Sequence, residues 1–210
     1  MSKRPDWRAF TEDQQSASKQ RRRAGGWRAK KAGESAEDMM MLVGQQYLIA
    51  EVAELRKRPE PYRRVGAALA NGQFIAAPLS KSGPDFDLAL PDGRAGLIEL
   101  KSRKGKRVPL NSVGQVQGDA LARRIKWSGF GVVMVMLWDE GVEARWWAVD
   151  WRRWHAARER GLKSFSDKQL DVIGTPCELM LGARPDWLPA LLKASLSAAE
   201  VEWPLDEQER

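Results

Sequence analysis

The most informative part of the sequence reads PDFDLALPDGRAGLIELK and spans residues 84–101. Apolar residues recur on both sides of Pro91-Asp92-Gly93, which is a typical turn sequence. The pattern predicts a β-hairpin over 85–101, with one strand from Phe86 to Leu90 and the other from Gly96 to Lys101. Such a hairpin needs further strands or helices to cover it, and the surrounding sequence must supply them.

Three polar residues of this hairpin are candidates for chemistry: Asp85, Glu99 and Lys101. Residues two apart share one face of a strand, so Glu99 and Lys101 point the same way, and Asp85 lies on the partner strand. We therefore expect two acids and a lysine at one edge of a sheet. Two carboxylates can hold a hard cation that polarises a phosphate, and a lysine can stabilise the charge that develops there. The alternative is a solvated Glu99–Lys101 pair without a catalytic role.

Composition limits the chemistry further. The chain has 210 residues with a single Cys and a single His, which leaves no Cys-rich or His-rich metal site. A metal would have to be held by carboxylates, which points to Mg²⁺, Mn²⁺ or Ca²⁺; of these we expect Mg²⁺, for which Mn²⁺ can substitute. The 35 Lys and Arg outnumber the 28 Asp and Glu, and residues 1–33 alone hold ten basic and three acidic residues. A polyanionic partner is the natural interpretation, and a solubility tail is the alternative.

The rest of the chain predicts an α/β fold in which a sheet is flanked by helices. Residues 1–33 read as a flexible basic arm, 34–194 as one domain, and 195–210 as an acidic tail. No signal peptide or membrane-spanning stretch is evident, so a soluble, cytoplasmic protein is expected. The expected elements are a helix at 34–50, a strand at 52–56, a hairpin or loop at 62–82, a helix from Asn111 or Ser112 to Lys126, strands at 129–138 and 142–149, and helices near 151–160, 167–173 and 186–199.

Several short motifs, in order and at consistent spacing, resemble the PD-(D/E)xK nuclease superfamily and, within it, the RecU-type Holliday junction resolvases. The resemblance covers roughly residues 34–194. The motifs are Glu37, Tyr47, Lys57-Arg58-Pro59-Glu60-Pro61, Asp85-Phe86, Glu99-Leu100-Lys101-Ser102, Pro109-Leu110, Gln117, the segment 161–165 and the segment 185–188. The resemblance implies a restriction-endonuclease-like core with a mixed central sheet and a stalk inserted at 62–82. An ordinary solvated loop at 62–82 is the alternative.

The same resemblance assigns roles to individual residues. It implies a metal held by Asp85, Glu99 and the Leu100 carbonyl, with Asp87 as a rival to Asp85 because the spacing to Glu99 is one residue longer here. Asp85 is favoured because it directly follows Pro84 and precedes Phe86. Further expected roles are catalysis for Lys101, completion of the acidic cluster for Glu37, and orientation of Lys101 or a water for Gln117. By sequence alone Glu37 and Gln117 also fit as ordinary surface residues of helices.

The implied function is a metal-dependent endonuclease that resolves four-way DNA junctions and acts as a homodimer, because two strands must be nicked symmetrically. The alternatives are another nuclease of restriction or repair type and a junction-binding protein without catalysis. The residues expected to contact DNA phosphates are basic: Arg21, Arg22, Arg23, Lys30, Lys31, Arg56, Lys57, Arg58, Arg63, Arg64, Lys81, Arg103, Lys104, Lys106 and Arg107.

Deleting residues 1–31 removes all ten basic residues of the arm. We expect weaker binding to every DNA shape and a flatter dependence of affinity on salt, because fewer counterions are released on binding. Fluorescence anisotropy with a duplex and a junction, each over a series of salt concentrations, measures both effects. Deleting residues 197–210 is the matched control and should not weaken binding. Unchanged affinity at moderate salt after the first deletion would make the arm a passive tail.

Overall fold

The computed structural model describes residues 36–59, 62–67, 71–78, 83–180 and 184–196. The predicted basic arm, with Arg21, Arg22, Arg23, Lys30 and Lys31, lies outside the described residues. The acidic tail from residue 197 onward and Lys81 also lie outside them. The structural statements below concern the described part of the chain.

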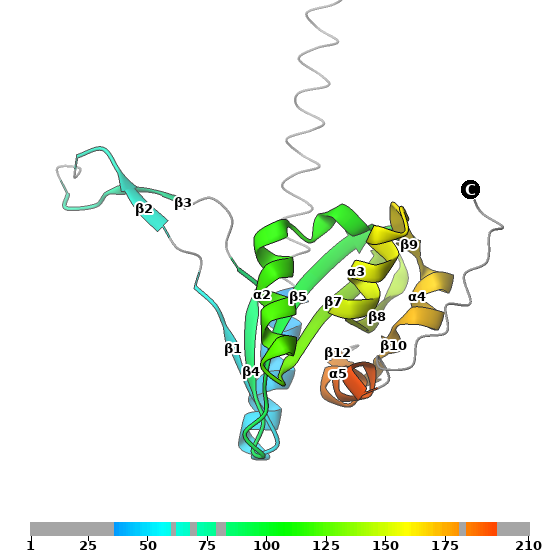
Figure 1. Cartoon of the computed structure of the whole chain (residues 1–210). Coiled ribbons are helices and arrows are strands. Elements are labelled where there is room, and N and C mark those ends of the chain that lie inside the picture. Colours follow the sequence, from blue (N-terminus) through cyan, green and yellow to red (C-terminus); the bar gives the residue numbers. More distant parts are fainter. Residues whose placement is uncertain (1–35, 60–61, 68–70, 79–82, 181–183, 197–210) are drawn as a thin grey trace, which may run out of the picture.

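A six-stranded mixed sheet forms the centre of the molecule, as predicted (Figure 1). Neighbouring strands are antiparallel, except that β5 and β7 run parallel. The expected hairpin is the pair β4–β5, which places β5 inside the sheet. In spatial order the strands are β1 (Glu54–Lys57), β4 (Phe86–Ala89), β5 (Ala95–Lys104), β7 (Phe130–Asp139), β8 (Val142–Asp150) and β10 (Thr175–Pro176).

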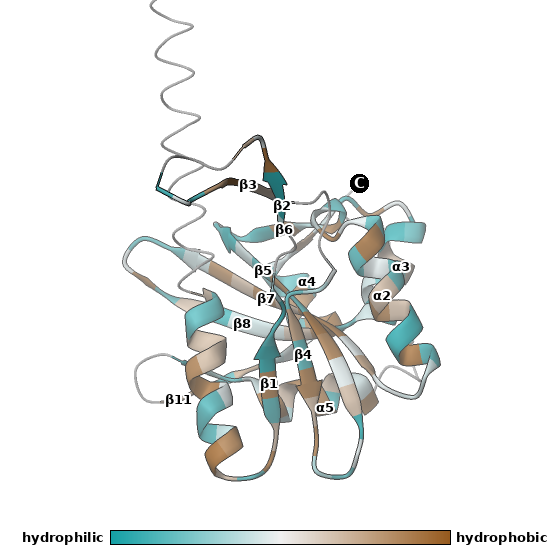
Figure 2. Ribbon diagram, turned by 90° about the vertical axis from the view of Figure 1, so that its left-hand side faces the viewer, coloured by the Kyte–Doolittle hydropathy of each residue, from teal (hydrophilic) through white to brown (hydrophobic). Residues whose placement is uncertain are grey.

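Helices cover both faces of the sheet and produce two apolar cores. The first helix, residues 36–49, packs with α5 (Trp187–Leu196) on one face. The other face carries α2 (Gln115–Lys126), α3 (Trp151–Glu159) and α4 (Asp167–Ile173). This double covering explains the continuous apolar sequence of β7, whose first eight residues are all buried. Figure 2 shows the apolar colouring gathered on the inner strands.

The first helix is fixed to α5 by contacts of two aromatic residues. The Tyr47 hydroxyl donates a hydrogen bond to Asp186, and its ring meets the Trp187 ring edge-on at 4.8 Å. The Trp187 indole N–H donates to the Met40 carbonyl at 3.3 Å. These contacts hold the helix that carries Glu37 at a fixed position against the sheet.

Some expected boundaries were wrong. The helix predicted from Asn111 or Ser112 begins at Gln115, because residues 110–112 form a 3-10 turn in which the Ser112 hydroxyl donates to the Pro109 carbonyl at 2.6 Å. Short strands that were not predicted lie in two small sheets. These strands are β6 (Arg107–Pro109) with β9 (Ser164–Ser166), and β11 (Glu178–Met180) with β12 (Arg184–Asp186).

The segment predicted as a hairpin or loop at 62–82 contains a two-stranded hairpin. β2 (Tyr62–Val65) pairs antiparallel with β3 (Ile75–Pro78) and forms a sheet of its own. The hairpin projects from the body of the molecule (Figure 1), and all four residues of β2 are exposed. Among the described helices, none combines the length and apolar character needed to cross a membrane.

Replacing residues 64–80 by a short Gly/Ser turn should leave the fold intact, because the described residues of the hairpin contribute nothing to either buried core. We expect the thermal unfolding midpoint to change by only about 2 °C or less, as for surface changes in a domain of this size. Circular dichroism on heating measures it. A drop of about 10 °C would mean that the hairpin stabilises the domain.

Candidate active site

Asp85 lies where the pairing of β4 with β5 ends. Its Oδ2 accepts a hydrogen bond from the Leu100 backbone N–H at 2.7 Å, and its own carbonyl accepts one from the Arg58 N–H at 2.8 Å. The N–H and C=O of a strand residue point to the same neighbour, so the Leu100 carbonyl faces the side on which Asp85 lies. Burial raises the pKa of Asp85, and the Leu100 N–H and the Lys101 charge oppose this rise.

Glu99 is the most constrained acid of the site. It lies on the interior strand β5, its side chain is 1% exposed, and it faces α2. The expectation of a site at a sheet edge is therefore corrected for Glu99, which lies on an interior strand beneath α2, whereas Asp85 lies just before β4 begins. Glu99 Oε1 accepts hydrogen bonds, whereas Oε2 is buried and has no hydrogen-bond partner. Burial raises the pKa of Glu99 to about 7, and the nearby Asp85 charge adds to this rise.

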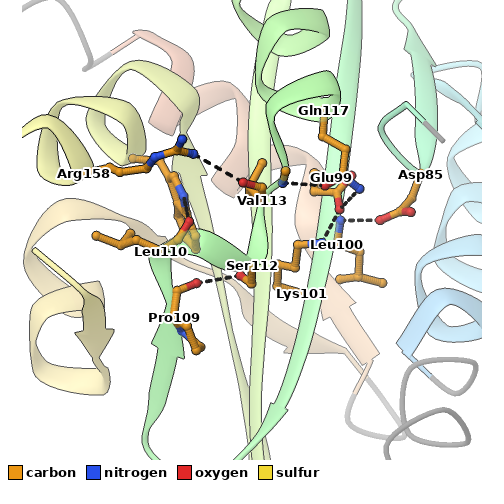
Figure 3. A network of polar contacts seen from close by, with 12 residues as sticks. Asp85, Glu99, Leu100, Lys101, Pro109, Leu110, Ser112, Val113, Gln117 and Arg158 are labelled. Atoms are coloured by element: carbon orange, nitrogen blue, oxygen red, sulfur yellow. Dashed lines mark hydrogen bonds and ion pairs between the residues drawn. The ribbon is translucent and has the colours of Figure 1, made fainter. Parts of the chain in front are cut away.

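Lys101 and Gln117 both donate to Glu99 Oε1 (Figure 3). The Gln117 Nε2 lies 2.6 Å from that oxygen, and the Gln117 Oε1 accepts the Gly114 N–H at 2.9 Å. A backbone N–H can only donate, so its partner must be the oxygen of the Gln117 amide. The amide nitrogen is therefore the end that faces Glu99. Gln117 thus contacts Glu99, and the orientation of Lys101 or a water by Gln117 stays a prediction.

The loop before α2 keeps Gln117 in place. The Arg158 guanidinium donates to the Val113 carbonyl at 3.4 Å, and the Trp154 indole donates to the Leu110 carbonyl at 3.2 Å (Figure 3). Within α2, a Cβ added to Gly118 would lie 2.6 Å from the Trp151 ring. The close approach of helix and ring therefore requires glycine, and it brings the first turn of α2 down onto Glu99.

Glu37 approaches from the opposite face of the sheet. Its Oε2 forms an ion pair with the Lys57 Nζ at 2.5 Å, and its charge contributes to the raised pKa of Asp85. Lys57 was expected to contact phosphate, but the structure places it beside the acids, where it lowers the pKa of Asp85. The sequence carries no signal for this position, since it depends on the pairing of β1 with β4.

The residues fit a divalent cation in part. In the described ranges no three His, Cys, Asp or Glu side chains lie close enough to hold a metal ion, so Glu37 does not complete a direct three-carboxylate set. Asp85, Glu99 and the Leu100 carbonyl remain as oxygen donors. The unpartnered Glu99 Oε2 is the observation that favours a cation, because a buried carboxylate oxygen without a partner is costly.

Asp87, the rival of Asp85, has a different environment. Its carboxylate is 47% exposed and pairs with the Arg58 guanidinium at 3.5 Å. In the register of β4 with β5, Asp87 lies opposite Leu97, whereas Phe86 lies opposite Ile98. The register therefore brings Asp85, and not Asp87, next to Glu99.

The basic residues predicted to contact DNA are spread over three places. Arg56 is exposed and pairs with Glu54 at 2.7 Å, and Arg63 and Arg64 lie on the projecting hairpin. The remaining ones follow the site along the chain: Arg103 and Lys104 end β5, Lys106 lies in the turn, and Arg107 begins β6. Lys104 pairs with Glu140 at 2.5 Å and Arg107 donates to the Ser164 hydroxyl at 2.9 Å.

Comparisons with known proteins add little to this geometry. No model of a protein family matches the sequence, and no curated protein matches it. Among solved structures, this chain is similar to Hjc, a Holliday junction resolvase from the archaeal hyperthermophile Archaeoglobus fulgidus, at 14% identity and a TM-score of 0.38. That match covers 68% of this chain and 93% of Hjc. A likeness of this degree carries no argument about function.

Glu99→Gln should stabilise the protein at pH 8 in the presence of a chelator. The pKa of Glu99 is about 7 when folded against an ordinary value of 4.5, so the folded state binds the proton more tightly. Stability therefore falls as pH rises from 4.5 to 7 and stays lowered above 7, and a neutral glutamine removes this loss. Urea denaturation should show a gain of roughly 1–3 kcal/mol at pH 8 and little gain at pH 5.

Glu159→Gln is the matched control, because that side chain is 67% exposed. It should leave the free energy of unfolding unchanged at both pH values. Equal or lower stability of Glu99→Gln at pH 8 would mean that Lys101 and Gln117 fully compensate the buried charge.

Proposed function

We propose that this protein is a metal-dependent DNA endonuclease that cuts four-way junctions, of the RecU type that its motifs resemble. Mg²⁺ is the proposed cofactor and branched DNA the proposed substrate. A homodimer with one site per chain would nick two strands symmetrically. A cytoplasmic location, in a bacterium or from a phage, agrees with this substrate. The alternatives are a PD-(D/E)xK nuclease of restriction or repair type and a junction-binding protein without catalysis.

The observation that carries the proposal is the Glu99 carboxylate. It is buried, one of its oxygens has no partner, and the only nearby cation that contacts it among the described residues is Lys101. A protein that only binds DNA gains nothing from such a carboxylate, because it destabilises the fold and repels phosphate. A nuclease needs it, because a bound cation would polarise the phosphate and lower the pKa of a water.

The residues of the chain divide the remaining work. Asp85 and Glu99 supply two carboxylates at fixed separation, held by the Leu100 N–H and by Gln117. During hydrolysis, the water oxygen bonds to phosphorus and releases a proton to solvent, while the bond to the leaving oxygen breaks and that oxygen takes up a proton. Negative charge gathers on the phosphoryl oxygens in the transition state. The Lys101 ammonium, which lies beside Glu99, is the group that would donate to them. Gln117 is a positioning residue that acts through Glu99.

The shape of the molecule supports a branched substrate. The β2–β3 hairpin projects away from the body (Figure 1) and carries Arg63 and Arg64, of which Arg64 lies over the exposed Phe74 ring at 5.9 Å. Phosphate contacts alone read charge and not branching, so selectivity needs an element that fits only where strands diverge. The hairpin is the candidate for that element.

Asp85→Asn and Glu99→Gln should each abolish Mg²⁺-dependent cleavage of a labelled four-way junction, a loss of about 100-fold or more, as for removal of other groups that stabilise transition-state charge. Junction binding should stay the same or tighten, because a negative charge facing phosphate is removed. Gel-based cleavage and anisotropy, with and without Mg²⁺, measure both. Asp92→Asn, in the exposed turn of the same hairpin, is the control and should cut normally.

Four outcomes decide between the candidates. Full cleavage by either variant would overturn the site, and loss in Asp87→Asn with normal cleavage in Asp85→Asn would transfer the role to Asp87. Binding without cleavage in the unaltered protein at any Mg²⁺ or Mn²⁺ concentration would favour the non-catalytic alternative. Equal cleavage of linear duplex and junction would favour a nuclease of restriction or repair type.

A further inference from the structure

A hollow near the end of α2 is not used by the proposed chemistry. It has a volume of about 180 Å³ and lies where the last turns of α2 face β4 and β5. Three arginines, one carboxylate, one leucine and one tryptophan line most of it: Arg58, Asp87, Leu97, Arg123, Arg124 and Trp127. The arginines come from two separate segments of the chain, so their convergence is a product of the fold.

Trp127 is the unusual member of this group. Its side chain is 67% exposed, whereas Trp146, Trp147 and Trp154 are almost completely buried. Its backbone N–H caps the end of α2 by donating to the Arg123 and Arg124 carbonyls, a task that needs no particular side chain. An exposed indole beside arginines is the combination that binds unpaired bases, which stack on the ring while the guanidinium groups contact phosphates.

The charge of the hollow agrees with an anionic ligand. Arg58 pairs with Asp87 at 3.5 Å, which neutralises the one carboxylate. Neither Arg123 nor Arg124 forms an ion pair with a described residue. Basic residues at a helix C-terminus interact favourably with the helix dipole, which accounts for Arg123 and Arg124. It does not account for Arg58, which lines the same hollow from outside the helix.

The hollow lies next to the acids of the candidate active site. Asp87 and Leu97 lie two residues along their strands from Asp85 and Glu99, on the same face of the sheet. Trp127 follows Gln117 by ten positions, which is about 15 Å along a helix. A DNA strand advances about 3.4 Å per nucleotide along the duplex axis, so this distance is about four nucleotides.

We propose that Trp127 stacks on an unpaired base of the DNA about two to four nucleotides from the phosphate that is cut, while Arg123 and Arg124 contact the adjoining phosphates. This inference rests on the proposed function and deepens it. It makes the site sensitive to the place where base pairing ends, because a stacked, paired base cannot present its face to the indole. The ligand class is a single-stranded segment that adjoins a duplex.

The test compares Trp127→Ala with the unaltered protein in the presence of a chelator, so that no cleavage occurs. The probes are a forked duplex with single-stranded flanks and a blunt duplex of the same length, followed by anisotropy. We expect about tenfold weaker binding to the fork and less than a twofold change for the blunt duplex, the size found for loss of one stacked base. Trp127→Phe should restore fork binding, and Val172→Ala, at a 52% exposed position of α4, should change neither.

A second readout reports stacking itself. A 2-aminopurine placed in the flank, at one to five nucleotides from the duplex end, should lose fluorescence with the unaltered protein and with Trp127→Phe, but not with Trp127→Ala. Quenching that persists in Trp127→Ala, or an equal loss of affinity for both probes, would overturn the proposal. If the unaltered protein binds a labelled four-way junction but not the fork, this inference fails alone; if it binds neither the junction nor the two probes, the proposed function fails, which separates the two failures.

Discussion

A carboxylate buried beneath a helix is the constraint on which the rest of the site depends. Glu99 keeps its charge in the core only because one oxygen accepts from Lys101 and Gln117, while the other stays unpartnered. Each such group costs several kcal/mol unless it is compensated, so the two apolar cores must supply the excess stability. The unpartnered Glu99 oxygen, whose burial lowers stability, therefore lies at the position where the proposed cation would bind.

The precision of the site comes from the register of β5. Leu97 belongs to one core and Ile98 and Leu100 to the other, so a slip by one residue would turn Glu99 to the opposite face. The parallel pairing with β7 continues from Gly96 to Lys104 and prevents such a slip. The same strand thus fixes the carboxylate, the lysine and the backbone N–H that binds Asp85.

The sequence predicts those parts of the fold that local patterns determine. The β4–β5 hairpin and β7 could be read because turn residues and a continuous apolar run are local signals. The β6–β9 pair could not be read, since it joins residues almost 60 positions apart by only three pairs. Within the site, the positions of Asp85 and Glu99 could be predicted from the Pro-Asp and Glu-x-Lys motifs of the hairpin. The Lys57–Glu37 ion pair and the Gln117–Glu99 hydrogen bond depend on strand order and on where α2 begins, which the residues alone do not determine.

The projecting hairpin and the acids are joined through the backbone. The hairpin β2–β3 is inserted between β1 and β4. At its base, the Arg58 N–H, just after β1, donates a hydrogen bond to the carbonyl of Asp85, just before β4. Arg58 also lines the hollow that contains Trp127. A nucleic acid engaged by the hairpin as proposed would therefore lie close to both the acids and the hollow. The element proposed to recognise strand divergence and the acids proposed for the chemistry are thus adjacent along the chain, and the pairing of β4 with β5 sets the position of Asp85 relative to Glu99.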